Sequence, residues 1–179
     1  AESALWALLR ALPLKHGRHR LLDVIKPEHW PHASTVVKTR YKGHDLLMDA
    51  DDLVGWHFLM LRSFDPQVSE VLCAVGQASQ RQVMWDIGAN KGACAYAVAT
   101  ELPHSRVVLI EPQTALAELL EHNMQELARG RYELHAVGVG PRQEMLELAI
   151  PADNKGRASL VHDLGSEDCR KVMVPMRTA

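Results

Sequence analysis

The chain has 179 residues, of which 47% are hydrophobic and 23% charged, with a formal net charge of -2. This length and composition predict one soluble globular domain with a real core, and the balanced charge gives no basic field of the kind that gathers nucleic acid. Three cysteines without a CxxC pair predict neither a disulfide framework nor a zinc ribbon, and they fit a reducing cytoplasm. We therefore expect neither a nucleic-acid partner nor a membrane partner.

The first 32 residues predict an amphipathic helix followed by a polar segment. Ser3 can cap the helix and Pro13 ends it, with four leucines on one face. The apolar part is too short for a bilayer, which needs about 20 apolar residues. Two HxxH pairs follow in a stretch interrupted by glycine and proline, so we interpret their histidines as solvated surface residues and expect no metal. The histidines are His16, His19, His29 and His32.

A β-hairpin is predicted next, with strands 35–41 and 45–49 around a turn at 42–44. Asp49, Asp51 and Asp52 follow it. They lack the further oxygen ligands of a calcium loop, so we interpret them as a polar turn. Residues 1–64 are thus expected to form an N-terminal extension of helix and hairpin, before a main domain that spans 65–179.

The main domain is expected to begin with a helix that Asp65-Pro66 starts and Gly76 ends. Val68, Val71, Leu72 and Val75 would form its buried stripe. The run VMWDIGANKG then predicts a strand at 83–87, a glycine turn at 88–92 and an alanine-rich helix at 93–102.

The later part of the chain repeats this alternation of strand and helix. The apolar run 106–110 is typical of a strand buried on both faces of a parallel sheet. A helix at 113–128 and a strand at 131–137 follow. The order predicts an α/β fold with a doubly wound, mostly parallel, Rossmann-like sheet.

Asp86 and Glu111 would lie together at the carboxyl ends of neighbouring strands. A dinucleotide site would prefer GxGxxG, but the loop here is GANKG. A carboxylate before the loop would repel a pyrophosphate, whereas it suits a ligand with an ammonium group. S-adenosyl-L-methionine has an ammonium group and a ribose diol, which the oxygens of Glu111 could accept.

Several motifs stand in an order that resembles one known family. They are DIGANKG at 86–92, IEP at 110–112, LLEHN at 119–123, HAVG at 135–138, NKGRASL at 154–160 and VMVPMRT at 172–178. The chain from about residue 61 onward resembles the FkbM-type S-adenosylmethionine-dependent methyltransferases. The resemblance implies a class I methyltransferase that transfers a methyl group to a hydroxyl oxygen of a sugar or other small-molecule or glycan acceptor.

The resemblance also implies which residues meet the cofactor. The methionine part of the cofactor would contact the glycine turn. Its ribose would contact Glu111, and its adenine would contact Pro112 and Val137. Asn154 and Ser159 would make further contacts. The turn residues concerned are Asp86, Gly88, Ala89, Asn90 and Gly92. No catalytic base is assigned, because His57, His135 and His162 are candidates only as histidines.

Members of that family continue beyond the R-T strand into a strand ending in an acidic D-x-E-G motif, which this sequence lacks. We therefore expect a chain truncated at its C-terminus, with the acceptor pocket in the missing part. Two alternatives stay open: a nicotinamide-dependent Rossmann oxidoreductase, and a truncated, non-catalytic module that binds S-adenosylmethionine. Taken singly, Asp86 could equally cap the helix that follows, and the two glycines could simply make a turn.

Overall fold

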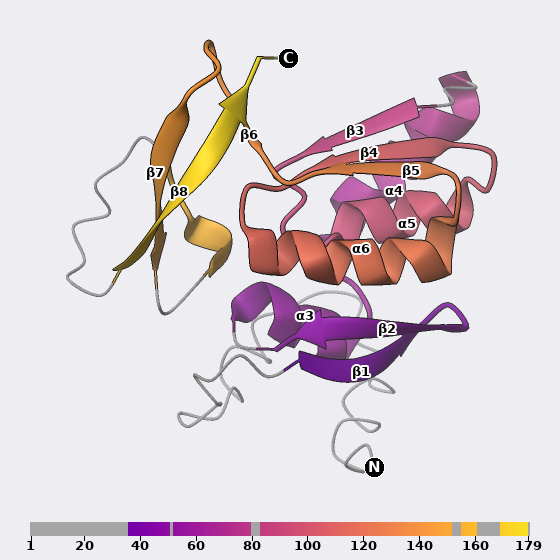
Figure 1. The fold of residues 1–179 in the computed structure, drawn as a ribbon. Helices are drawn as coiled ribbons and strands as arrows, with labels where there is room; N and C mark the ends of the chain where they lie inside the picture. Colours follow the sequence, from indigo (N-terminus) through magenta and orange to yellow (C-terminus); the bar gives the residue numbers. More distant parts are fainter. Residues whose placement is uncertain (1–35, 51, 80–82, 152–154, 161–168, 179) are drawn as a thin grey trace.

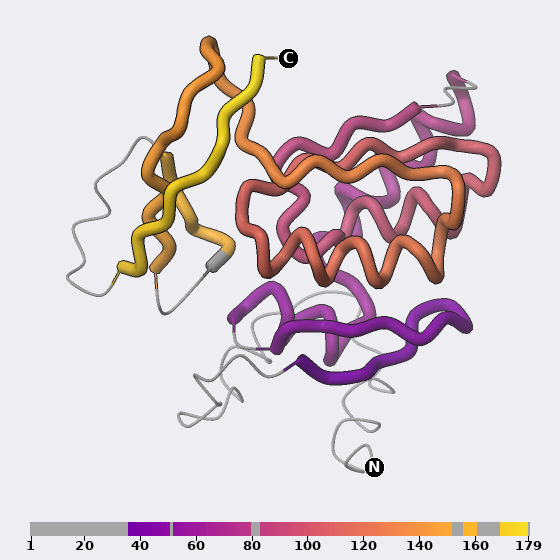
Figure 2. The backbone as a smooth tube through the Cα atoms, viewed as in Figure 1, coloured from indigo at the N-terminus to yellow at the C-terminus, as the bar shows by residue number. Residues whose placement is uncertain are grey.

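The computed structural model describes residues 36–50, 52–79, 83–151, 155–160 and 169–178 (Figures 1 and 2). The predicted N-terminal helix, the four HxxH histidines, Asp51, Asn154 and His162 lie outside these ranges. The described elements are β1 (Val36–Tyr41), β2 (His44–Asp49), α3 (Leu53–Leu61), α4 (Pro66–Ser79), β3 (Val83–Ile87), α5 (Ala93–Glu101), β4 (Arg106–Ile110), α6 (Thr114–Ala128), β5 (Tyr132–His135), β6 (Gly138–Val139), β7 (Met145–Pro151), η1 (Lys155–Arg157) and β8 (Cys169–Arg177). None of the described helices combines the length and the hydropathy needed to cross a bilayer.

The strands β3, β4 and β5 form a parallel three-stranded sheet in that order. The connections run through α5 and α6, as the alternating pattern predicts. Central strand β4 is buried from Val107 to Ile110, which confirms the expectation drawn from its apolar run. The chain is therefore an α/β protein with a parallel sheet, and the carboxyl ends of its three parallel strands meet at one edge.

Helices α4, α5 and α6 all lie on one face of this sheet (Figure 1). On the other face, Val83, Trp85 and Ile87 of β3 are 49%, 59% and 59% exposed. The described helices thus cover one face of the sheet and leave three apolar side chains of the edge strand β3 exposed on the other. The second helical layer that a doubly wound sheet requires remains a prediction.

Helix α4 differs from its prediction in both its end and its buried face. It runs through Gly76 and ends at Ser79. Gly76 serves close packing instead of ending the helix, since an added Cβ would lie 2.5 Å from the Cδ1 atom of Leu102. Cys73 is buried, whereas Val68, Val71 and Val75 are 43–61% exposed. The three valines therefore face away from the described core, whereas Leu72 of the same predicted stripe is partly buried against it.

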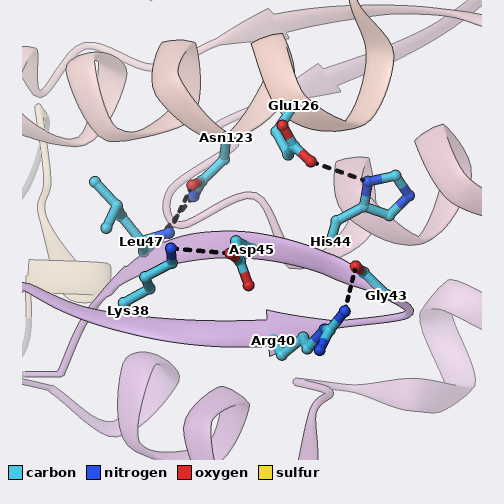
Figure 3. Close-up of polar contacts among 8 residues, drawn as sticks. All are labelled: Lys38, Arg40, Gly43, His44, Asp45, Leu47, Asn123 and Glu126. Carbon is cyan, nitrogen blue, oxygen red and sulfur yellow. Dashed lines mark hydrogen bonds and ion pairs between the residues drawn. The ribbon is translucent and has the colours of Figure 1, made fainter.

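The predicted hairpin is present, with β1 and β2 paired antiparallel around a two-residue turn. Lys42 and Gly43 both have positive φ, 46° and 92°, as a type I′ turn requires. The hairpin packs on α6, where the Asn123 amide exchanges two hydrogen bonds with the backbone of Leu47 at 2.8 and 2.7 Å (Figure 3). The helices therefore lie between the parallel sheet and the hairpin.

Helix α3 was not predicted, and it changes the interpretation of the acidic cluster before it. Asp52 is its N-cap and accepts a hydrogen bond from the Gly55 N–H at 3.0 Å. The predicted polar turn therefore contains two buried carboxylates, since Asp49 and Asp52 are only 5% and 1% exposed. One buried cluster joins hairpin and α3 residues such as Tyr41 and Phe58 to Tyr96 of α5.

A second three-stranded sheet in the order β6-β8-β7 follows β5. The predicted strand 131–137 is therefore shorter than expected, ending at His135, and Val137 lies in the connection to β6. Strands β7 and β8 pair antiparallel over seven residue pairs around a small core of Leu148, Val174 and Met176. This sheet stands beyond the carboxyl ends of β3, β4 and β5 in both views of the chain (Figures 1 and 2).

Candidate functional site

The glycine turn folds back over the end of the neighbouring strand. The N–H groups of Gly88 and Ala89 both donate to the carbonyl oxygen of Ile110, at 2.9 and 3.0 Å. Gly88, Asn90 and Gly92 have φ values of 79°, 49° and 79°, so every second residue of the turn is left-handed. This conformation favours glycine and tolerates asparagine, which explains the spacing of GANKG.

The two glycines are required for different reasons. A Cβ on Gly92 would come within 2.6 Å of Tyr96 and of Leu120, both fully buried, so only glycine fits between the turn and the helices. A Cβ on Gly88 would meet nothing within 4 Å. Gly88 therefore faces open space at the carboxyl edge of the sheet, where a ligand can approach the backbone.

Glu111 fastens the turn to β4. Its side chain is 3% exposed, its Oε2 accepts the Asn90 N–H at 2.8 Å, and its Oε1 accepts the Gln113 N–H at 2.9 Å. Burial raises the pKa of this carboxyl, these N–H donors oppose the rise, and the nearby charge of Asp86 adds to it. Glu111 thus lies at the site as predicted, with each oxygen already holding one backbone donor.

Asp86 is the last residue but one of β3. Its carboxylate accepts the backbone N–H of Ala95 at the start of α5. It therefore does cap the helix. Burial raises its pKa, and its Oδ2 atom has no hydrogen-bond partner among the described residues. Asn90 Oδ1 is a second buried acceptor without a partner in the same part of the chain. The turn thus combines an open backbone position with two acceptors that lack donors.

Pro112 and Val137 are half-buried. Pro112 follows the end of β4 as predicted, whereas Val137 follows β5 instead of ending the predicted strand. A hydrogen bond of 3.1 Å from the Glu111 N–H to the His135 carbonyl joins the ends of these two strands. The structure therefore brings eight of the ten predicted residues to one edge: Asp86, Gly88, Ala89, Asn90, Gly92, Glu111, Pro112 and Val137.

Ser159 is held by a different sheet. Its backbone exchanges two hydrogen bonds with Ala149 of β7, at 3.0 and 2.9 Å. Its pairing with β7 thus places Ser159 beside the second sheet, and Asn154 lies outside the described residues.

The two described histidine candidates have different surroundings. His57 is 4% exposed within α3, with its ring 6.0 Å from that of Phe64. The His135 side chain is about half exposed beside Glu133, its Nε2 atom 3.8 Å from the Glu133 Oε2 atom. Neither has a described contact with Asp86 or Glu111, so no catalytic base is assigned.

Lys91 and Asp52 belong to the surroundings of the turn, and the sequence reasoning missed both. They form an ion pair of 2.7 Å between Nζ and Oδ1 that is 0–1% exposed. One signal was available, since Asp52 directly precedes an apolar run without proline, as an N-cap does.

Two cavities between described elements lie away from these residues. One cavity, of about 360 Å³, lies between α4 and α5 and is also lined by Tyr41 and Phe58. The other, of about 390 Å³, lies between β2 and α6. Neither is lined by Asp86, Gly88 or Glu111.

Comparisons of the chain with models of known protein families, with characterised proteins and with solved structures gave no match. Functional reasoning about this chain therefore depends on its own residues and geometry.

Proposed function

We propose that the chain is an S-adenosylmethionine-dependent methyltransferase, with its cofactor site at the glycine turn between β3 and α5. The observation that carries the proposal is the pair of buried acceptors without donors, Asp86 Oδ2 and Asn90 Oδ1, beside the open position at Gly88. A native site keeps few such atoms, so they call for a ligand rich in donors.

The donors of S-adenosylmethionine fit this set of acceptors. Its α-ammonium group carries three N–H donors and a positive charge, which an ionised Asp86 would balance. Its ribose diol carries two O–H donors. The carboxylate of Glu111 accepts two backbone N–H groups and a bond from the Gln113 side chain, which leaves room for a further bond because a carboxylate offers about four acceptor positions.

The backbone of the turn is less suited to phosphate. A phosphate cradle needs N–H groups that point at the ligand. Here Gly88, Ala89, Asn90 and Gly92 all donate within the protein, to Ile110, Ile110, Glu111 and Ala89 respectively. Together with two carboxylates that would repel a pyrophosphate, this argues against a nicotinamide dinucleotide.

The cofactor, when bound, supplies a methyl group already activated by the sulfonium. The protein then contributes binding and orientation, because a correctly placed acceptor needs little further activation. Asp86 and Asn90 would hold the methionine part, Glu111 the ribose, and Pro112 and Val137 would lie against the adenine. The acceptor class, a hydroxyl of a sugar or other natural product, follows from the motif resemblance. The proposal includes the doubly wound arrangement, with further structure over the exposed face of β3.

The test is a calorimetric titration with S-adenosylhomocysteine, with NADH as the control ligand. Asp86→Asn keeps an oxygen to accept the Ala95 N–H but removes the charge, and Glu118→Gln changes an exposed carboxylate of α6 instead. We expect saturable binding by the wild type and by Glu118→Gln, and affinity lower by about tenfold or more in Asp86→Asn. Absence of saturable binding by the wild type, or equal affinity in all three proteins, would overturn the proposal.

A further inference from the structure

One side chain of the glycine turn points away from the open edge and into the protein. Lys91 is 1% exposed, and its ammonium group lies 2.7 Å from Asp52 Oδ1 and 2.9 Å from the carbonyl oxygen of Asp49. Asp49 is the last residue of β2, and Asp52 is the N-cap of α3. The turn is therefore fastened directly to the N-terminal part of the chain.

The segment that receives Lys91 is itself closely packed. Asp52 Oδ1 also accepts the Gly55 N–H at 3.0 Å, so one oxygen both caps α3 and pairs with the lysine. A Cβ on Gly55 would lie 1.8 Å from the Asp49 carbonyl oxygen and 3.1 Å from Lys91 Nζ. Gly55 is thus needed for α3 to approach the place where the ammonium group is bound.

Asn90 lies between two attachments. Its own N–H is bound by Glu111, and the next residue is held by Asp52 and Asp49. Its φ of 49° is unfavourable for a residue with a Cβ, so the surrounding contacts must maintain it. Releasing Lys91 would keep the bonds of the turn to Ile110 and Glu111 but remove its attachment to Asp52 and the Asp49 carbonyl.

We propose that Lys91 is a positioning residue that, through Asp52, makes the N-terminal β-hairpin and α3 part of the cofactor site by fixing the backbone of Asn90. The ligand in this inference rests on the proposed function. The fastening of the turn does not, and it can be measured without ligand.

A merely structural contact offers the matched control. Asn123 also joins the N-terminal part to the helices, through Leu47 and the Tyr96 hydroxyl, without touching the glycine turn. Asn123→Ala should therefore loosen the hairpin and leave the turn in place. Lys91→Met should release the turn and leave Asp52 charged and buried, which destabilises the fold as well.

A double variant separates stability from position. Lys91→Met with Asp52→Ser removes both charges and keeps a side chain that can cap α3. Because no unpaired charge remains, we expect its thermal midpoint to recover relative to Lys91→Met. In the double variant the glycine turn still lacks its attachment to the N-terminal part, because the lysine bonds to Asp52 and to the Asp49 carbonyl are both lost.

The experiment measures S-adenosylhomocysteine affinity by calorimetry and hydrogen exchange of the Asn90 amide without ligand, both well below each midpoint. We expect affinity lower by about tenfold and exchange faster by about tenfold in Lys91→Met and in the double variant, with Asn123→Ala close to the wild type in both. Unchanged Asn90 exchange in the Lys91 variants, equal effects in Asn123→Ala, or affinity that recovers in the double variant would overturn the inference. A wild type that does not bind the ligand contradicts the proposed function instead, and the exchange result still decides the role of Lys91.

Discussion

Replacing each glycine of the turn by alanine separates backbone strain from steric conflict. Gly88 and Gly92 share a φ of 79°, so an alanine at either position incurs the same left-handed penalty of about 1–2 kcal/mol. At Gly92 the new Cβ also meets Tyr96 and Leu120 at 2.6 Å, and overpacking of this kind costs about 1–3 kcal/mol. The expected losses are therefore about 1–2 kcal/mol for Gly88→Ala and about 2–5 kcal/mol for Gly92→Ala.

Urea unfolding, with the slope checked for constancy, measures both losses. The loss of ligand affinity should not follow the loss of stability in these two variants. Gly88→Ala fills the open position at the carboxyl edge, although the protein retains most of its stability. We expect Gly88→Ala to weaken S-adenosylhomocysteine binding in a fully folded protein. Equal losses of stability in the two variants would refute the assignment of Gly92 to the helix contact and Gly88 to the ligand side.

Three further predictions concern the carboxylates and the exposed sheet face. Burial raises the pKa of Asp86, so the folded chain holds this proton more tightly than the unfolded chain and loses stability as pH rises from the ordinary carboxyl range through the raised pKa. Asp86→Asn should therefore be more stable than the wild type at neutral pH, with an advantage that shrinks as the pH falls, and urea midpoints across pH would show the opposite trend if the reasoning fails. Glu111→Gln should instead destabilise by about 1–3 kcal/mol, because its NH₂ group must face one of the two backbone donors, and unchanged thermal unfolding would contradict this. Trp56→Ala should lower stability by about 3–5 kcal/mol, since Trp56 is 0% exposed. Trp85 is 59% exposed in the described structure, so Trp85→Ser should change stability by less than about 1 kcal/mol where the β3 face is open; a loss close to that of Trp56→Ala in urea unfolding would show that the further structure proposed over β3 is already present in this chain.

Elements with an uninterrupted local signal were predictable from the sequence. β4 is a run of branched apolar residues, and α6 has leucines at helical spacing with a glycine after its end, and both elements lie within a residue of their predicted bounds. The glycine turn was predictable because left-handed residues have few substitutes. These signals come from residues that are close together in the sequence, so they can be recognised without knowledge of the fold.

Features that depend on tertiary contacts were not predictable in the same way. Leu72 of the apolar stripe of α4 packs against the core, but the three valines of the stripe are exposed, because the sequence does not show which side of the helix meets α5. Gly76 resembles a helix stop, but it serves close packing against Leu102. Asp52 and Lys91 lie 39 positions apart, and nothing in either local sequence shows that they meet in the interior.

The candidate site shows the same division. Asp86 and Glu111 were placed at adjacent strand ends from strand order alone, and the structure brings them there. The different roles of the two Asp86 oxygens could not be deduced from the sequence. One caps α5, and the other has no partner among the described residues. Ser159 was included through a motif, and its pairing with Ala149 places it in the second sheet.

The central claim, that the cofactor lies at the glycine turn, is tested most directly by mapping where S-adenosylhomocysteine slows amide hydrogen exchange in the wild-type chain. The account predicts slower exchange in residues 86–95 and 111–113, with little change in the β1–β2 turn or along α4. Saturable binding with slower exchange confined to the groove between α4 and α5, and none at the glycine turn, would contradict it.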